Sequence, residues 1–274
     1  KAIRGLCMAC FEGELYVGLD RAGGGGCFKY AKERWVDCGV LDEKDNFECL
    51  MSMGGVLYGA SHTAVYRYEG DKCWRCIGRQ PHGITQIHSM LVADGKLWIG
   101  TWPQGYVLRH EGDDRWVNTG RLGLATDQEG IKPINEINAL AVHNGKIYAG
   151  VLPKAQVYRY ESDGHWTLLG SLASRSDWDQ EVCPSWVRVL TLTTHQGRLF
   201  ACTGACQARA RDVDADHTVG RVLACEAGVV VSHAQDLGGD WTHLMAVRQG
   251  SSLKLYINGK LAAQSKLPRG RSFD

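Results

Sequence analysis

The feature that most constrains the fold is a unit of roughly fifty residues that recurs along the chain. Residues 95–120 read GKLWIGTWPQGYVLRHEGDDRWVNTG, and residues 145–170 read GKIYAGVLPKAQVYRYESDGHWTLLG. Similar runs after a glycine are GELYVG at Gly13, GVLYGA at Gly55 and GRLFAC at Gly197. Spacings of about 40 to 53 residues between these glycines are typical of propeller blades rather than of helical solenoids. The repeat therefore predicts an array of similar β units.

Each of the first four units ends in a tryptophan that lies at a nearly constant distance from its glycine. These tryptophans are Trp35, Trp74, Trp116 and Trp166. Apolar segments precede the glycines, aromatic segments follow them, and none has a sustained helical period. One unit thus reads as four short strands, and radial stacking of such units buries both faces of each sheet. We predict an all-β fold, a β-propeller of four-stranded blades, with about five to six blades in this chain.

The pattern resembles the kelch-like and Asp-box-like repeats of β-propellers, in which a VYRY-type strand precedes a DG turn and a tryptophan. The segment VYRYESDGHW carries this likeness best, with Ser162, Asp163 and Gly164 approximating an Asp box. The resemblance covers about residues 5–210 and implies propeller blades over residues 1–219. It implies no particular activity, because propellers host many functions.

Residues 220–274 have a different pattern. The stretch DWTHLMAVRQGSSLKLYINGKLAAQSK resembles the central hairpin of a laminin-G-like or concanavalin-like jelly roll. Asn258 and Gly259, between alternating apolar residues, predict a type I′ hairpin turn. Because this stretch keeps the spacing of the repeat, a last propeller blade is the alternative. In both cases we expect Trp241 and His243 to be packing and hairpin residues.

The charge balance excludes two classes of partner. The chain has 31 Lys and Arg residues against 30 Asp and Glu, a formal net charge of +1, and no basic block. Nucleic acids and anionic membrane surfaces attract concentrated positive charge. No apolar run approaches the roughly 18 residues of a membrane helix. We therefore predict no nucleic-acid partner and no membrane span, and we expect a sequence that begins at Lys1 to be a piece of a longer chain.

The cysteines are many for a chain of this length, 11 in all. Cys7 and Cys10, and also Cys73 and Cys76, have the CxxC spacing of zinc ligands. A zinc site needs both thiolates of a pair to point at one ion, whereas residues three apart in a strand point to opposite faces. We therefore predict structural thiols, no metal site and no cofactor.

Four further cysteines lie in the last third of the chain, where a disulfide is possible. They are Cys183, Cys202, Cys206 and Cys225, and the sequence leaves their pairing open. A disulfide would indicate an oxidising compartment. We expect an extracellular, cell-surface or periplasmic location.

The loops between the strands offer the candidate binding site. In a propeller, the loops that join the second strand to the third and one blade to the next gather on one face, where ligands usually bind. Tryptophan rings stack on sugars, while amides and carboxylates bind hydroxyl groups. The predicted ligand-binding residues are Asp20, Arg21, Trp102, Asn135, Glu136, Lys154, Trp178 and Trp186, and the same loops also carry His82, Asn138 and Asp177.

These residues predict a ligand-binding propeller that recognises a glycan or a protein ligand on its loop face. The first alternative is a polysaccharide-active propeller enzyme, a lyase or a glycosidase, with His62, His88 and Tyr106 as candidate catalytic residues. A lyase would also need a cation for the uronate carboxylate, such as Arg21 or Lys154. No local catalytic signature appears, which favours binding over catalysis. The second alternative is a structural or protein-interaction propeller whose loop tryptophans pack inward.

Overall fold

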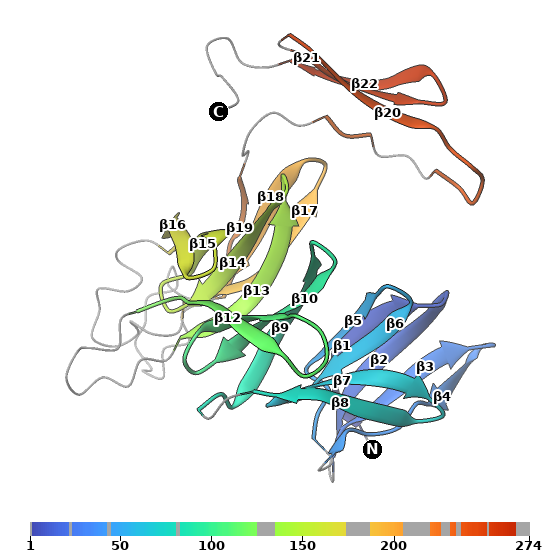
Figure 1. The fold of residues 1–274 in the computed structure, drawn as a ribbon, viewed down its shortest axis with the longest axis vertical. Helices are drawn as coiled ribbons and strands as arrows, with labels where there is room; N and C mark the ends of the chain where they lie inside the picture. Colours follow the sequence, from blue (N-terminus) through green and yellow to red (C-terminus); the bar gives the residue numbers. More distant parts are fainter. Residues whose placement is uncertain are drawn as a thin grey trace.

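The computed structural model describes residues 2–21, 24–42, 45–80, 83–124, 135–173, 187–204, 220–225, 231–233, 237–250 and 252–266. These residues form strands, turns and loops, and the strands make six antiparallel sheets. None of them forms a helix long and apolar enough to cross a membrane. The predicted all-β class, a propeller built from four-stranded blades, is confirmed (Figure 1).

Four sheets are blades of four strands in which neighbours in the sheet are neighbours in the chain. The first blade consists of β1 (Ala2–Phe11), β2 (Glu14–Arg21), β3 (Gly26–Ala31) and β4 (Arg34–Asp37), and the second of β5 (Cys49–Met53), β6 (Val56–Ala60), β7 (Ala64–Gly70) and β8 (Cys73–Arg79). The third blade consists of β9 (Gln86–Ala93), β10 (Lys96–Trp102), β11 (Tyr106–His110) and β12 (Trp116–Arg121). The fourth consists of β13 (Glu136–His143), β14 (Lys146–Leu152), β15 (Gln156–Ser162) and β16 (His165–Ser171).

The other two sheets have three strands each within the described ranges. The fifth sheet contains β17 (Val189–His195), β18 (Arg198–Thr203) and β19 (Val222–Cys225), and the sixth contains β20 (Leu244–Gln249), β21 (Ser252–Ile257) and β22 (Lys260–Lys266). The fifth sheet packs on the fourth blade and continues the series of blades.

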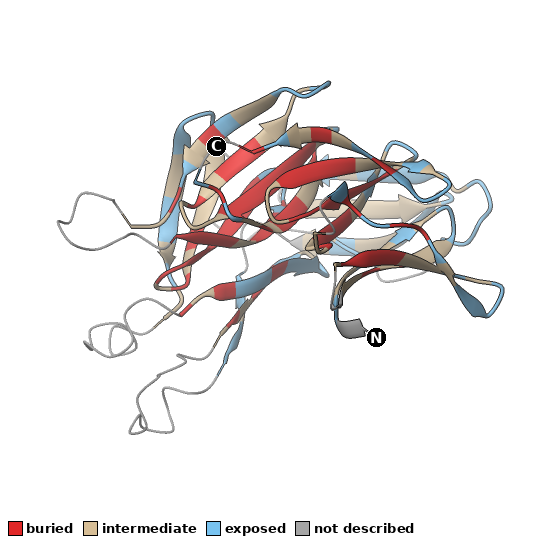
Figure 2. Ribbon diagram, turned by 90° about the horizontal axis from the view of Figure 1, so that it is seen from below, coloured by how far each residue is buried: buried red, intermediate tan, exposed pale blue. Residues whose placement is uncertain are grey.

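The first strands of the five blades, β1, β5, β9, β13 and β17, lie side by side around the middle of the molecule (Figure 1). Four clusters of buried apolar side chains fill the spaces between successive blades. Figure 2 shows that buried residues concentrate along the strands and that exposed residues gather at the hairpin ends. The second, third and fourth blades therefore each share one core with the blade before and another with the blade after.

Strand β10 shows how the sequence fits these two cores. Leu97 and Ile99 are fully buried between the second and third blades. Trp98, which lies between them in the sequence, is buried between the third and fourth blades. Successive side chains of a strand point to opposite faces, so an apolar run such as LWI supplies both cores at once.

The tryptophan that ends a unit contacts the preceding blade. Its indole Nε1 donates a hydrogen bond to the backbone carbonyl of the residue that comes just before the glycine of the preceding Trp-x-x-x-Gly segment. The three bonds run from Trp74 to Cys38 (2.9 Å), from Trp116 to Ile77 (3.1 Å) and from Trp166 to Thr119 (3.0 Å). The tryptophan and the glycine of the repeat therefore meet across blades and link one unit to the next.

The glycine is required because the indole lies against it. A Cβ atom at Gly120 would lie 2.6 Å from Cδ1 and 2.7 Å from Nε1 of Trp166, closer than side chains can pack. At the equivalent Gly170, in the fourth blade, no atom of the described ranges lies within 4 Å of the same position. Trp35, in the first blade, is 54% exposed and stacks on Tyr30 with ring centroids 5.2 Å apart.

The sixth sheet, β20–β22, lies apart from the five blades in Figure 1, and its described side chains are exposed or half-buried. The predicted turn at Asn258 and Gly259 is present, with both residues at positive φ. His243 is a hairpin residue as expected, because its N–H donates to Asn258 Oδ1 at 2.9 Å. The expected packing of Trp241 is wrong, since this side chain is fully exposed.

Candidate functional site

A polar cavity of about 290 Å³ lies at the centre of the propeller. All five inner strands or the residues just before them contribute to its lining, among them Cys7, Glu48, His88, Asn138 and Thr191. We call the polar side chains at its mouth the channel ring, which consists of Glu48, His62, His88, Glu136, Asn138 and Arg188. These residues come from the second, third, fourth and fifth blades.

Glu136, the first residue of β13, connects three members of the channel ring. Its Oε1 accepts hydrogen bonds from Asn138 Nδ2 at 2.7 Å and from Arg188 Nη1 at 3.3 Å. His88 Nε2 lies 3.1 Å from the same oxygen. The Glu136 side chain is almost fully buried, so its charge is held by these neighbours rather than by water.

Burial shifts the pKa values of His88 and Glu136 in opposite directions, and each shift favours the neutral form of the group. Desolvation, together with the charges of Arg188 and His62, lowers the pKa of His88 to about 4. Desolvation raises the pKa of Glu136, while Arg188 and the Asn138 hydrogen bond oppose that rise. His88 is therefore neutral at pH 7, and its contact with Glu136 joins a neutral imidazole to a carboxylate.

On the other side of the cavity, His62 lies between two carboxylates. Its Nδ1 is 2.5 Å from Asp45 Oδ1, and its Nε2 is 3.1 Å from Glu48 Oε1. The His62 backbone N–H also donates to Asp45 Oδ2 at 3.1 Å, which fixes the loop after β6 against the loop before β5. Burial raises the pKa of Glu48, and the nearby His62 opposes that rise.

Two buried oxygen atoms of the channel ring accept no hydrogen bond within the part of the chain that the structure describes. They are Asn138 Oδ1 and Glu48 Oε1, the latter close to His62 without hydrogen-bond alignment. Buried acceptors without a donor are costly, by about 1–3 kcal/mol each. The ring therefore offers two acceptors to a ligand that carries O–H or N–H groups.

The structure brings four of the residues singled out in the sequence into the channel ring, namely His62, His88, Glu136 and Asn138. Asp20 lies at the end of β2, where its Oδ2 accepts from Arg4 Nε at 3.0 Å. Arg4 also acts electrostatically on Glu48, so this pair borders the ring.

Trp102 and Tyr106 lie on the loop side of the third blade but outside the lining of the cavity. Trp102 is half-buried, and its carbonyl accepts from the N–H of Thr85 at 3.0 Å. Tyr106 packs against the core between the second and third blades, with Arg121 6.0 Å from its ring centroid. The ligand-binding role of Trp102 stays a prediction.

Asn135 and Lys154 support the loops that carry them. Asn135 is fully buried, and its amide exchanges two hydrogen bonds of 2.9 Å with the backbone of Leu124. The Lys154 carbonyl accepts a hydrogen bond from Ser171 Oγ. The side chain of Arg21 and all of Trp178, Trp186, His82 and Asp177 lie outside what the structure describes, so their predicted roles remain predictions.

Three residues of the site were missed in the sequence, namely Glu48, Asp45 and Arg188. A signal for two of them is present when the strands are aligned backward from the hairpin glycines. The position seven residues before the glycine holds Glu48, His88 and Asn138, counted from Gly55, Gly95 and Gly145. The position nine residues before it holds Arg4, Gln86, Glu136 and Arg188, counted from Gly13, Gly95, Gly145 and Gly197. These two polar columns interrupt otherwise apolar strands.

The described cysteines carry free thiols, in agreement with structural roles. Burial raises the pKa of Cys7 to about 12, and it also raises the pKa of Cys49. Cys202 and Cys225 are free, so they form no disulfide, while Cys183 and Cys206 fall outside the described ranges and a bond between these two stays untested. No group of three metal-ligating side chains occurs among the residues that the structure describes.

Comparison of the sequence with models of protein families and with curated proteins gave no match. Solved structures do match. The extracellular domain of the hybrid two-component system BT4673 from B. thetaiotaomicron is 15% identical, with a TM-score of 0.58 over 92% of this chain and 32% of that one. A second BT4673 extracellular domain, described as a one-component system, is 14% identical, with a TM-score of 0.53 over 91% of this chain and 32% of that one.

A gluconolactonase structure is 15% identical over 92% of this chain and 84% of its own, with a TM-score of 0.48. What the chain shares with the two BT4673 domains is a fold. It spans about a third of the length of the BT4673 domains, whose locations in their own proteins are extracellular. Function therefore has to be argued from the channel ring.

Proposed function

We propose that this propeller binds a polyhydroxylated ligand, such as one sugar residue of a glycan, at the channel ring. The observation that carries the proposal is that two buried acceptors make no hydrogen bond among the described residues: Asn138 Oδ1, and Glu48 Oε1, which lies 3.1 Å from His62 Nε2. Sugar hydroxyl groups are donors of the matching kind. The cavity, about 290 Å³, lies at the small end of ligand pockets, which start at about 300 Å³.

The other ring members support the same ligand class. Arg188 donates to Glu136 and so places a guanidinium beside the buried carboxylate of the ring. Neutral His88 offers one donor or acceptor without a charge to be desolvated. A site of neutral and paired groups suits an uncharged, hydroxyl-rich ligand better than an ion.

A glycan array tests the proposal, with wild-type protein beside Asn138→Ala and a matched control, His165→Ala. His165 is an exposed residue in the hairpin between β15 and β16, far along the strand from the loop face. We expect Asn138→Ala to lose at least about tenfold in affinity for each bound glycan and the control to bind like wild type. Equal binding by all three proteins would show that glycans do not bind at the channel ring.

The second candidate function is a polysaccharide-active enzyme, and the contact between His88 and Glu136 favours it. A neutral imidazole beside a buried carboxylate is a plausible general base, and Arg188 lies close enough to face a uronate. Incubation with a panel of polyuronates and neutral polysaccharides, followed by reducing-end or unsaturated-product assays, tests this. Turnover that His88→Ala abolishes and His165→Ala retains would establish catalysis; no turnover on the panel leaves binding as the function.

Two features outside the ring extend the proposal. We place the chain in the extracellular space, in line with the extracellular domains that share its fold. We also assign β20–β22 to a laminin-G-like domain, because a sheet whose described side chains are exposed or half-buried on both faces needs further strands to form a core.

A further inference from the structure

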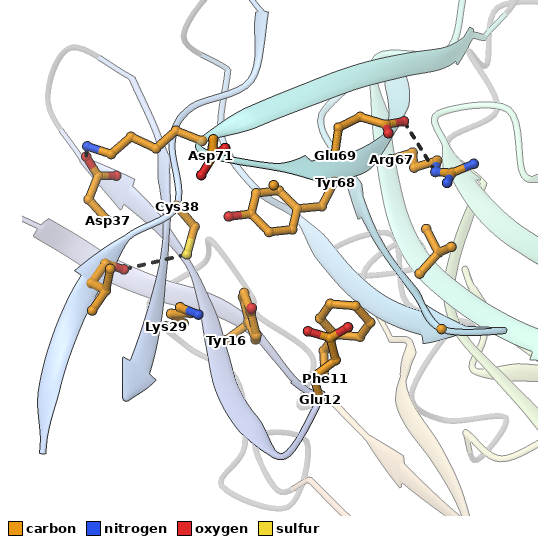
Figure 3. Close-up of a pocket in the computed structure, with 15 residues that line it drawn as sticks. Phe11, Glu12, Tyr16, Lys29, Asp37, Cys38, Arg67, Tyr68, Glu69 and Asp71 are labelled. Atoms are coloured by element: carbon orange, nitrogen blue, oxygen red, sulfur yellow. Dashed lines mark hydrogen bonds and ion pairs between the residues drawn. The ribbon is translucent and has the colours of Figure 1, made fainter. Parts of the chain in front are cut away.

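A second cavity, of about 750 Å³, lies between the first and second blades (Figure 3). Its lining includes the hairpin turns at Glu12 and at Asp71, so it opens at the ends of the strands opposite the loop face. We call it the blade groove. It shares no lining residue with the central cavity, and the proposed function makes no use of it.

Three aromatic rings form one wall of the blade groove. The rings of Phe11 and Tyr16 meet edge to face with centroids 5.8 Å apart, and those of Tyr16 and Tyr68 are 6.2 Å apart. Figure 3 shows the Tyr68 ring standing across the groove, with Phe11 and Tyr16 below it. Tyr16 and Tyr68 come from different blades, so the wall bridges them.

The equivalent place between the third and fourth blades is filled by an arginine. Arg109 lies over the ring of Trp98, 5.2 Å from its centroid. Its Nη1 and Nη2 donate to the two carboxylate oxygens of Asp163 at 2.7 and 2.9 Å, and Nη1 also lies 3.2 Å from the Tyr160 hydroxyl. The guanidinium therefore has a ring beneath it and a bidentate carboxylate at its edge.

The repeat places the same acceptors around the blade groove. Tyr16 and Trp98 each stand three residues after a hairpin glycine, Tyr68 and Tyr160 each stand six residues before the blade tryptophan, and Asp71 and Asp163 stand three residues before it. Lys29 occupies the position of Arg109, with its Nζ 6.0 Å from the centroid of the Tyr16 ring and 2.6 Å from Glu14 Oε2, but it does not reach a carboxylate of the second blade as Arg109 reaches Asp163 of the fourth. In the described part of the chain, Asp71 makes no hydrogen bond or ion pair.

The charges of the blade groove favour a cation. Two of its carboxylates are paired within the lining, Asp37 with Lys72 at 2.9 Å and Glu69 with Arg67 at 3.3 Å. The carboxylate of Asp71 remains available at the mouth. An aromatic wall beside an available carboxylate is the setting in which a planar cation gains both stacking and charge-assisted hydrogen bonds.

We propose that the blade groove binds an arginine side chain presented by a partner polypeptide, in the pose that Arg109 adopts between the third and fourth blades. Arginine fits better than lysine because its flat guanidinium can stack on the half-buried Tyr68 ring while its fork reaches both oxygens of Asp71. The choice of arginine rests on the equivalent place between the third and fourth blades, which is filled by Arg109 of this chain.

Calorimetric titration of the full chain with blocked arginine (N-acetyl-arginine N-methylamide) tests the proposal, with blocked citrulline as the uncharged isostere. We expect saturable binding of blocked arginine, at least tenfold weaker binding of citrulline, and at least tenfold weaker binding to Asp71→Asn. The matched control is Asp113→Asn, which changes the same repeat position in the third blade. Equal binding of both compounds, or equal effects of both variants, would overturn the proposal.

Two further experiments test how the arginine side chain binds and whether it comes from a polypeptide. Lys29→Arg supplies an internal guanidinium at the position of Arg109, and we expect it to displace blocked arginine and to raise the melting temperature. A Lys29→Arg protein that binds blocked arginine like wild type would contradict the shared pose. Tighter binding of free L-arginine than of blocked arginine would contradict a polypeptide source.

Discussion

Trp116 in the third blade donates its indole N–H to the carbonyl oxygen of Ile77 in the second, at 3.1 Å. The indole also lies against Gly78, the residue that follows Ile77 and has a positive φ of 144°. The same bond recurs at Trp74 and Trp166. One short motif thus supplies, in the second and third blades, both the donor for the blade before it and the surface for the blade after it.

Substitution of Gly120 by alanine tests this contact between blades. The new methyl group would displace Trp166 and break its hydrogen bond to Thr119. Gly170→Ala is the matched control, because Gly170 has nearly the same φ (153° against 157°) and none of the described residues lies within 4 Å of the added atom. We expect urea unfolding to show Gly120→Ala less stable than Gly170→Ala by about 1–3 kcal/mol. Equal losses would mean that backbone strain alone accounts for the glycine.

The low pKa of His88 predicts a loss of stability in acid. Because its pKa is about 4 in the folded protein and about 6.5 in an unfolded chain, acidification below pH 6.5 protonates the unfolded state first. The free energy of unfolding should then fall as the pH drops from 6.5 toward 4, by about 2 kcal/mol at pH 5. Glu136 acts in the opposite sense, since its raised pKa favours proton uptake by the folded state.

Urea unfolding of wild type and His88→Gln at pH 7 and pH 5 isolates the histidine contribution. The variant should lose less stability between the two values than wild type does. His165→Gln, at an exposed turn, should keep the wild-type difference. The same difference in all three proteins would contradict a neutral, desolvated His88.

The ion pair between Arg109 and Asp163 should contribute modestly to the junction of the third and fourth blades. It is bidentate, but the Asp163 side chain is 45% exposed, so screening by solvent reduces it. In a double-mutant cycle with Arg109→Gln and Asp163→Asn, we expect a coupling energy of about 1 kcal/mol. The more exposed pair of Lys72 and Asp37 should give less than half of that, and the reverse order would contradict this ranking.

Trp102 offers a test of the binding site that is independent of the ring. It is half-buried on the loop face and lies outside the lining of the central cavity. If it stacks on a glycan that extends from the ring, Trp102→Ala should weaken binding of oligosaccharides by about fivefold to tenfold and leave monosaccharide binding unchanged. Isothermal titration with a monosaccharide and a longer oligomer of the same sugar measures both effects. Equal losses for the two ligands would place Trp102 within the ring site instead.

Much of the fold could be predicted from spacing alone. The glycines and the tryptophans gave the strand order of four blades, and the apolar run LWI in β10 occupies two cores as a buried strand should. The contact of Trp116 with the preceding blade could not be predicted, because it depends on how two sheets are stacked. For the same reason nothing in the sequence indicated that Trp241 would be exposed.

The candidate site was predicted in part. His62, His88 and Glu136 were named from their loops, but the role of Glu136 as the common acceptor depends on Arg188, which lies 52 residues further along the chain. Such a pair becomes visible in sequence only when the repeats are aligned at the starts of their inner strands. Asn135 was predicted to bind ligand because it is a polar loop residue, but both hydrogen bonds of its side-chain amide go to the backbone of Leu124.

The central claim is that a hydroxyl-rich ligand occupies the channel ring. The most direct measurement is a crystal structure of the chain bound to the sugar with the strongest signal on a glycan array. The account requires sugar hydroxyl groups within hydrogen-bond distance of Asn138 Oδ1 and Glu48 Oε1, the two acceptors without a donor. Sugar bound only on β20–β22, or elsewhere on the loop face with both acceptors untouched, would contradict it.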